Sequence, residues 1–524
     1  MLNALTIIRS LIIYGLCLPL AVYLGYVVAN PMDRTAFVVV IAVAALPLIP
    51  IVLRWHHMLL VLSWNFSMVL FFIQGSPYLW MAMTATSLLL TILQQILKRD
   101  VNFSSVSSIT WSLLFLAFVI FITAKLTGGM GIRSFGGANY GGKRYVQLFC
   151  AIAGYFAITA FRIPKDKAIL YTGLYFLGTL SLAVGSLGPW MPGGLQFLFA
   201  LFPVDNLASL SGGATENMRL GGLTFASVGL ACFILARHGM SGLFGLGESW
   251  RFLPIQFHGG LGVNQPWRLL MFLTIMVIAL MGGYRSVPIL FIMVFTGLFL
   301  LERLYRTNLA PILVIAGILF LAVSIPFVQK MPLTVQRSLS FLPIEVDPLA
   351  KSAADDSSEW RVNMWKEVVP TIPQYLIVGK GYGMDARFVE MQTAYDLGNQ
   401  TDDGSGAIAA SDFHNGPLSL IIPLGIFGAI GFLWFLFASI RTLLNNYRHG
   451  DPELHHINTF LLAYFVTKTV FFFGVFGSFQ GDLAVFVGLI ALSVSLNGGS
   501  CQPVVETSTN PAHLPFRLPK AARA

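Results

Sequence analysis

Long apolar runs separated by short polar segments are the feature that most limits what this chain can fold into. Several runs exceed the roughly 18 to 20 apolar residues that a helix needs to cross a bilayer. Over the whole sequence 56% of the residues are hydrophobic and 10% are charged, whereas soluble proteins carry about 25% charged residues. The sequence therefore predicts an all-α, polytopic membrane protein, and it excludes a soluble multidomain enzyme with a single membrane anchor.

Charged turns and turns rich in glycine and proline divide the apolar runs into candidate membrane helices. The candidates lie near residues 4–29, 36–53, 58–74, 78–97, 106–126, 144–161, 168–187, 219–236, 268–284, 286–301, 309–329, 415–440, 457–475 and 483–496. We therefore expect about 12–14 transmembrane helices. Four parts follow: helices 1 to 11 with short loops in 1–329, a large external loop in 330–414, C-terminal helices in 415–497, and a disordered cytoplasmic tail in 498–524.

The basic residues gather in short loops that fall on one side of the predicted membrane. Six loops carry them, at 54–57, 98–100, 162–167, 237–268, 302–306 and 441–450. The positive-inside rule assigns this side to the cytoplasm and residues 330–413 to the outside. Loop placement thus accounts for the net charge of +9 without a nucleic-acid partner. Three of the four cysteines lie in apolar runs, so no disulfide framework, metal site or cofactor is predicted.

The large external loop, 330–413, departs sharply in composition from the membrane helices. It contains DDSSEW at 355–360, followed by RVNMWKEVVPTIP, whose apolar periodicity predicts a helix capped by Ser357 or Ser358. GKGYG at 379–383 lacks a full GxGxxG, so it is a weak nucleotide-binding motif. Because loops of this length are usually functional or disordered, and the helix pattern indicates order, we expect a folded, functional loop.

Four motifs between residues 282 and 428 resemble those of the O-antigen ligase and polymerase superfamily. GGYRSVPILFIMVFTG (282–297) is similar to the segment in which an arginine opens a membrane helix in that family. RVNMW (361–365) resembles its R-x-x-x-W, VGKGYG (378–383) its glycine turn, and HNGPLSLIIPLGIFG (414–428) its His-Asn followed by an apolar run. The motifs occur in the family's order, and their predicted membrane side is the one the family requires.

The resemblance implies a bacterial glycosyltransferase of the inner membrane, with several membrane spans and an active site facing the periplasm. Its donor would be a glycan linked to undecaprenyl pyrophosphate, and its acceptor would be lipid A-core, a glycan or another molecule in contact with the bilayer. The family's chemistry implies an inverting, metal-independent transfer. Two alternatives stay open: polymerisation of glycan repeat units, and, from another class, transport of a lipid or polysaccharide. Transport predicts several ionisable residues at mid-membrane depth, and Lys468 is nearly the only one.

Glycosyl transfer from a lipid pyrophosphate requires positive charge for the leaving group. Arginine stays protonated and can form two parallel hydrogen bonds to phosphate oxygens. Arg285 at the outer end of a predicted span and Arg361 on the loop are the first candidates, and Arg219 at another outer helix start is the third. The competing interpretation for each is an interfacial anchor that reaches lipid headgroups.

The transfer also requires a base for the acceptor hydroxyl, and His414 is the candidate. Imidazoles exchange protons near neutral pH, and His414 lies where the external loop meets the next membrane helix. The alternative is a structural histidine that caps that helix. Supporting residues are predicted as well: Asp412 and Asn415 as groups that orient the ring, Asp482 as a more distant acid for the same task, and Trp365 for sugar stacking or loop packing.

Overall fold

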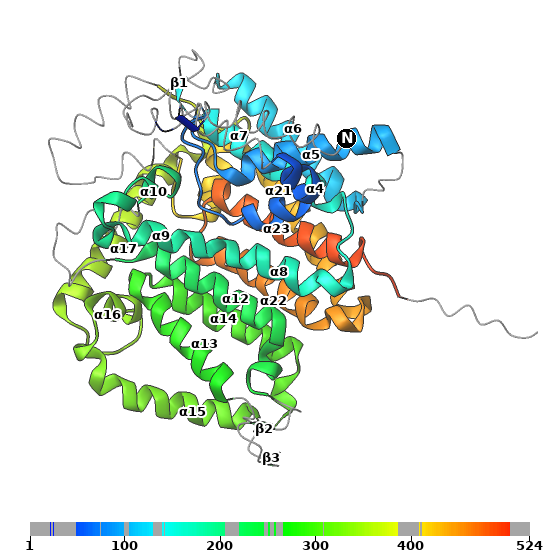
Figure 1. The fold of residues 1–524 in the computed structure, drawn as a ribbon. Helices are drawn as coiled ribbons and strands as arrows, with labels where there is room; N and C mark the ends of the chain where they lie inside the picture. The colour runs from blue at the N-terminus through cyan, green and yellow to red at the C-terminus, as the bar shows by residue number, and fades with distance from the viewer. Residues whose placement is uncertain are drawn as a thin grey trace, which may run out of the picture.

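The computed structural model describes residues 49–73, 75–98, 104–128, 142–204, 219–245, 266–307, 309–385 and 411–503, with a few isolated positions between them. Within this part of the chain the fold is a bundle of helices, many of which run in the same general direction (Figure 1). The two short ladders that accompany the helices have strands of two residues: β1 (Asn139–Tyr140) pairs with β4 (Met384–Asp385), and β2 (Trp250–Arg251) pairs with β3 (Gln256–Phe257). The prediction of an all-α membrane protein is confirmed.

One group of helices combines the early and the late parts of the chain. It contains α4 (Ile49–Ser63), α5 (Leu79–Lys98), α6 (Ser107–Leu126), α7 (Gly142–Thr159), α21 (Gly416–His449) and α23 (Phe479–Asn497). The helix α21 packs against α6, and α23 packs along α7, so helices far apart in sequence lie side by side (Figure 1). Side chains such as Phe432, Phe486 and Leu148, all fully buried, fill the space between them. The core of this group therefore depends on both ends of the chain.

A second group surrounds α12 and is joined to the first through α22. It contains α8 (Ala168–Leu177), α9 (Leu182–Ser186), α12 (Gly221–Leu243), α13 (Pro266–Ala279), α14 (Ser286–Leu301) and α22 (His455–Gly474), with α15 (Leu309–Ser324) at the margin of the bundle (Figure 1). The helix α22 packs against α12, α14 and α21. It therefore connects the two groups, and its outer end can supply side chains to a site between them.

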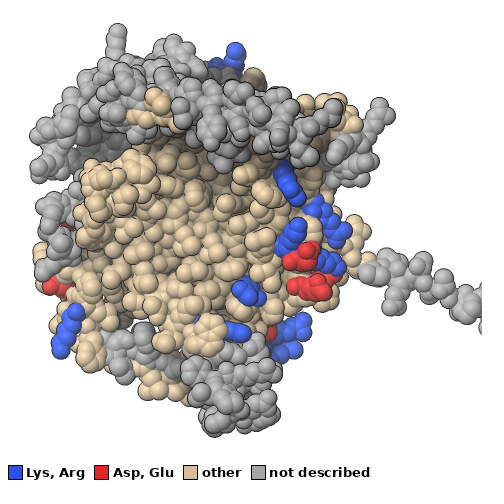
Figure 2. All heavy atoms as spheres, in the orientation of Figure 1, with Lys and Arg blue, Asp and Glu red and all other residues tan. Residues whose placement is uncertain are grey.

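The helices have the length and composition expected of membrane spans. Among the described residues, seven helical segments are long and apolar enough to cross a bilayer, and three shorter apolar ones cover Ile49–Ser63, Trp267–Gly282 and Ser286–Leu301. Figure 2 shows tan residues, which carry no Lys, Arg, Asp or Glu charge, across the middle of one face, and charged side chains mostly toward its right-hand end. The protein is therefore a multi-pass membrane protein. Most of the predicted spans 4–29 and 36–53 lies outside the described residues.

The chain around His56 and His57 differs from the prediction. We expected residues 54–57 to form a cytoplasmic turn, but they lie inside α4, which has one non-helical residue at Trp55. His56 Nδ1 lies 2.9 Å from Ser87 Oγ, and His57 Nε2 lies 2.8 Å from the Ile158 carbonyl. Because neighbouring helices provide these polar partners, the two rings can be buried within the helix. The predicted span 58–74 correspondingly ends early, at Ser63.

The described part of the external loop, up to residue 385, forms the α-helices α16 (Leu333–Leu339), α17 (Pro348–Val368) and α18 (Ile372–Tyr375). The prediction that Ser357 or Ser358 caps the loop helix is wrong, because α17 begins about ten residues earlier. Its cap is Asp347, whose carboxylate accepts a hydrogen bond of 2.8 Å from the Leu349 backbone N–H. Proline at the first helical position favours this start. The serines therefore lie within the helix, where they can face the membrane domain.

The helix α21 is interrupted where the external loop meets it. Pro423 lies inside α21, and Gly425 adopts a left-handed conformation with φ of 67°. Backbone N–H groups of Lys380 and Gly381 donate to the carbonyls of Ile422 and Pro423, at 2.7 and 2.9 Å. In return the Ile426 N–H donates to the Leu376 carbonyl at 2.6 Å. The loop backbone thus satisfies polar groups that the broken helix leaves without partners.

The polar segments gather at two opposite ends of the bundle. At one end Lys165 forms an ion pair with Asp451, and Glu302 accepts hydrogen bonds of 2.8 Å from the backbone N–H groups of Met240 and Ser241. These contacts bring together predicted cytoplasmic loops. The opposite end carries α16 and α17, together with the chain entering α12, α14 and α21. Apart from residues 54–57, which lie inside α4, the described contacts group these loops as the charge pattern predicts.

Candidate functional site

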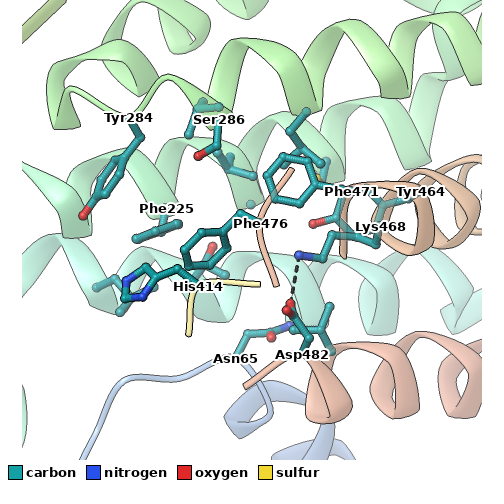
Figure 3. Close-up of a pocket in the computed structure, with 18 of the residues that line it drawn as sticks. Asn65, Phe225, Tyr284, Ser286, His414, Tyr464, Lys468, Phe471, Phe476 and Asp482 are labelled. Carbon is teal, nitrogen blue, oxygen red and sulfur yellow. Dashed lines mark hydrogen bonds and ion pairs between the residues drawn. The ribbon is translucent and has the colours of Figure 1, made fainter. Parts of the chain in front are cut away.

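A cavity of about 610 Å³ lies between the two helix groups at the end that carries α17. Its walls come from α8, α12, α14 and α22, and from α17 and the segment entering α21. Polar side chains from distant parts of the sequence reach it: Asn65, Arg219, Tyr284, Ser286, Ser357, Arg361, His414, Lys468 and Asp482. Figure 3 shows His414 and Tyr284 near one end of the cavity, and Lys468 with Asp482 near the other.

Arg219 lies just before α12 and is held against the turn that leads into α14. Its Nε donates a hydrogen bond of 2.9 Å to the Gly282 carbonyl, and its guanidinium carbon lies 4.8 Å from the centre of the Tyr284 ring. The adjacent Gly283 has φ of 68°, a conformation that glycine adopts without strain. This turn therefore places Arg219, Tyr284 and the start of α14 together at the cavity.

Arg285 joins α14 to the loop helix α17. It is the residue before the first turn of α14, and its Nη2 donates a hydrogen bond of 2.6 Å to Ser358 Oγ. Its neighbours Tyr284 and Ser286 line the cavity, while Arg285 itself is not part of the lining. The position between two elements allows Arg285 to hold the loop over the cavity and to contribute charge to it.

Arg361 lines the cavity from α17, about one helical turn after Ser358. Its Nε is buried, and no hydrogen-bond acceptor lies near it in the described part of the chain. Burial lowers the pKa of Arg361, and the positive charges of Arg285 and Arg219 lower it further. A buried N–H without an acceptor costs free energy, so this side chain is suited to an anion that supplies the missing acceptor.

Arg337 is a fourth guanidinium at this site, and sequence reasoning missed it. It lies in the short loop helix α16. Burial lowers its pKa to about 10, and repulsion from the other three guanidinium groups contributes to the shift. The arginine cluster consists of Arg219, Arg285, Arg337 and Arg361. Among the ion pairs of the described residues, none joins Arg285, Arg337 or Arg361 to a carboxylate. Nothing in the local sequence QRSLS signals the role, because the proximity is purely tertiary.

His414 lies at the edge of the cavity in a constrained conformation. Its φ of 51° is left-handed, which is uncommon for residues other than glycine. The ring makes edge contacts with Trp360 and Phe476, at centroid distances of 5.4 and 5.2 Å. Nδ1 lies 3.4 Å from the Asp412 carbonyl oxygen and 3.8 Å from its carboxylate. Nδ1 faces Asp412, so Nε2 is the ring nitrogen left without a described partner.

Asn415 and Trp365 have structural contacts of their own. The Asn415 side-chain oxygen accepts a hydrogen bond of 3.1 Å from the Leu418 N–H, so Asn415, rather than His414, caps α21. Trp365 Nε1 donates to the Phe413 carbonyl at 2.8 Å, and the ring packs against a small core around Met364. Both side chains therefore fix the backbone on either side of His414. Of the two loop tryptophans, Trp360 is the one that lines the cavity.

An ion pair between Lys468 on α22 and Asp482 on α23 forms the other end of the cavity (Figure 3). Lys468 Nζ lies 3.0 Å from Asp482 Oδ1, and Asp482 Oδ2 accepts a hydrogen bond of 2.9 Å from the Ser478 N–H. Their side chains are 13% and 12% exposed. The charge of Lys468 is thus balanced by Asp482. Asp482 pairs with Lys468 and not with His414, the residue it was predicted to support.

Comparison with known families gives a match that covers the central part of the site. Residues 269–433 match the model of a family described as O-antigen ligase. The matched range includes Arg285, Arg337, Arg361 and His414, whereas Arg219 and Asp482 lie outside it. A search of curated proteins found no relative that matches the chain.

Proposed function

Since residues 269–433 match the O-antigen ligase family, the resemblance to the O-antigen ligase and polymerase superfamily is confirmed, and from it we propose an activity. The protein is a membrane glycosyltransferase that moves a glycan from undecaprenyl pyrophosphate to an acceptor hydroxyl, with inversion and without a metal ion. One observation carries the proposal: Arg219, Arg361 and His414, from three separate elements, line the same cavity beside Arg285.

The cavity has parts that suit the two ends of such a donor. Apolar side chains of α12, α14 and α22, including Phe225, Leu290 and Phe471, line it within the bundle. They suit the hydrocarbon chain of a lipid, which gains about 25 cal/mol for each Å² removed from water. The arginines Arg219 and Arg361 occupy the part near the external loop, where they meet a pyrophosphate at the membrane surface.

The reaction is a single displacement at the anomeric carbon of the donor. His414 Nε2 accepts the proton of the acceptor hydroxyl as its oxygen forms a bond to that carbon. The bond between the anomeric carbon and the pyrophosphate oxygen breaks, and its electron pair stays on the pyrophosphate. Arg285, Arg361 and Arg219 stabilise the negative charge that develops there, which is the charge-assisted arrangement expected for a phosphate leaving group.

The proposed orientation in the membrane follows from the charge of the loops. The end with Lys165 and Asp451 faces the cytoplasm, and the end with the arginine cluster faces the periplasm of the bacterial inner membrane. This orientation gives the site access to glycans that have been completed and moved across the membrane. Acceptors of the ligase type, such as lipid A-core, and acceptors of the polymerase type, such as a second lipid-linked glycan, would both approach from the same side.

The experiment that tests the proposal is product formation by the purified protein, alongside donor binding, for wild type and His414→Ala. A base in this position contributes about 10² to 10⁴ in rate. We expect turnover to fall by such a factor while donor affinity changes little, and we expect a chelator to leave the wild-type rate unchanged.

Two results of the same experiment would contradict the proposal. Undiminished turnover of His414→Ala would remove the proposed base. Movement of the donor across vesicles without a new glycosidic bond would favour a transporter. Supplying a lipid-linked glycan and a lipid A-core acceptor in separate reactions distinguishes polymerisation from ligation.

A further inference from the structure

A second cavity, of about 390 Å³, lies on the other side of Arg219 between the loop helices α16 and α17. Arg219 lines both cavities, whereas Arg337 lines only the second. The remaining walls are mostly small or hydroxyl-bearing side chains, such as Thr334, Ala350 and Ser352. Because both helices belong to the external loop, the second cavity is built for a water-soluble group and not for a hydrocarbon chain.

The number of positive charges exceeds what a pyrophosphate requires. A pyrophosphate substituted at both ends carries roughly two negative charges, and the released form carries roughly three, because a terminal phosphate has a second pKa near 6. Three guanidinium groups of the cluster match that product. Arg337 is the fourth, and it is the member that lies in the separate cavity.

The acid in the wall of the second cavity does not balance Arg337. Asp356 is the one carboxylate among its described lining residues. Asp356 Oδ2 lies 3.4 Å from Ser352 Oγ in an exposed contact. The charges that act on the pKa of Arg337 are those of the other arginines and of Tyr284, and Asp356 is not among them. Arg337 thus keeps its positive charge in a partly buried place without a carboxylate partner among the described residues.

We propose that the cavity between α16 and α17 is a subsite for an anionic substituent of a glycan, a carboxylate or a phosphate, bound by Arg337 with Arg219. The proposal rests on the glycosyltransferase function proposed above and adds a substrate class to it. The substituent belongs either to the glycan being transferred or to the acceptor, because both must lie next to the pyrophosphate position. Thr334 and Ser352 supply hydroxyl groups for the same anion.

The test compares matched acidic and neutral substrates with wild type, Arg337→Gln, Arg337→Lys and the control Lys351→Gln. Lys351 is an exposed cation of α17 outside the cavity lining. One series uses undecaprenyl-pyrophosphate disaccharides that end in a uronic acid or in the corresponding neutral sugar. The other uses acceptor oligosaccharides with or without a phosphate monoester. The measured quantity is the ratio of kcat/KM for the acidic substrate to that for its neutral counterpart.

We expect Arg337→Gln to lower this ratio by about tenfold to a hundredfold in one of the two series. Arg337→Lys should restore part of it, and Lys351→Gln should leave it at the wild-type value. The affected series identifies the carrier of the anion. An unchanged ratio in both series would overturn the subsite, and so would an equal loss for acidic and neutral substrates, which would assign Arg337 to the pyrophosphate. A wild type that forms no glycosidic product from any pair would instead overturn the proposed function.

Discussion

Replacement of Arg361 by glutamine tests whether the arginine cluster was built for an anion. The structure predicts opposite effects of Arg361→Gln on stability in the absence and in the presence of the donor. Without a ligand, Arg361 is half-buried among positive charges, and its Nε lacks an acceptor. Removing the charge relieves repulsion that no described carboxylate offsets. We therefore expect the unliganded variant to be as stable as wild type or more stable, by up to about 1 kcal/mol after allowing for solvent screening.

With the donor present, the stability difference between Arg361→Gln and wild type should change sign. A hydrogen bond between a charged donor and a charged acceptor contributes about 1.5–3 kcal/mol, so Arg361→Gln should bind the lipid-pyrophosphate donor about tenfold to a hundredfold less tightly. Arg361→Lys should recover only part of this loss, because lysine keeps the charge but lacks the planar fork. The difference in stability between variant and wild type should accordingly change direction when donor is added.

The assay is thermal unfolding in detergent with and without the lipid-pyrophosphate donor, combined with measured donor affinity. Lys366→Gln is the matched control, since Lys366 is an exposed cation on the same helix, and it should leave both quantities near the wild-type values. A large loss of stability in unliganded Arg361→Gln would show that the guanidinium supports the fold. Wild-type donor affinity in both Arg361 variants would refute its role in binding pyrophosphate.

Three further predictions concern other parts of the molecule. Gly283→Ala forces a left-handed conformation on alanine and places its Cβ 3.4 Å from Arg219 Nε. Donor affinity should therefore fall about tenfold in the binding assay, and stability should fall by about 1 kcal/mol. Wild-type donor affinity would contradict this prediction. Asp482→Asn leaves the buried Lys468 without its carboxylate and should lower the free energy of unfolding by about 3–5 kcal/mol, measured by thermal unfolding. The double variant Lys468→Met with Asp482→Leu should recover most of this lost stability. Equal losses of stability in the two variants would argue against this account. In intact spheroplasts, Glu359→Cys should react with a membrane-impermeant thiol reagent and Glu453→Cys should not; the reverse pattern would place the site in the other compartment.

Much of the candidate site was accessible from residue type and position along the chain. Arg219, Arg285 and His414 were recognised because each lies where an apolar run begins, and a charge or imidazole at that position needs a reason. Their grouping follows from counting the membrane spans along the chain, because the count places the helix starts at Arg219, Arg285 and His414 on the same side of the membrane. Arg337 escaped because it lies in a loop without such a boundary, and its neighbours at 219 and 285 are distant in sequence.

Two other differences between the predicted and the observed structure concern His56 with His57 and the start of α17. The first depends on tertiary partners, and the second on a sequence signal that was overlooked. His56 and His57 looked like part of a polar turn, because a sequence does not show that Ser87 and the Ile158 carbonyl are in reach. The start of α17, in contrast, has a readable signature in Asp347 followed by proline, a typical helix start. The apolar periodicity after residue 361 led to a predicted helix start at Ser357 or Ser358, later in the chain than the observed start at Pro348.

The backbone pairing between the external loop and the broken helix α21 limits how the loop can move. Three hydrogen bonds join residues 376–381 to residues 422–426, and Gly379 packs so closely that a side chain there would meet the Pro423 carbonyl. This part of the loop cannot swing outward as a lid unless α21 deforms with it. For the proposed lipid-linked donor we therefore expect entry to the cavity from the side, between helices and from within the bilayer, beneath the fixed segment 376–381.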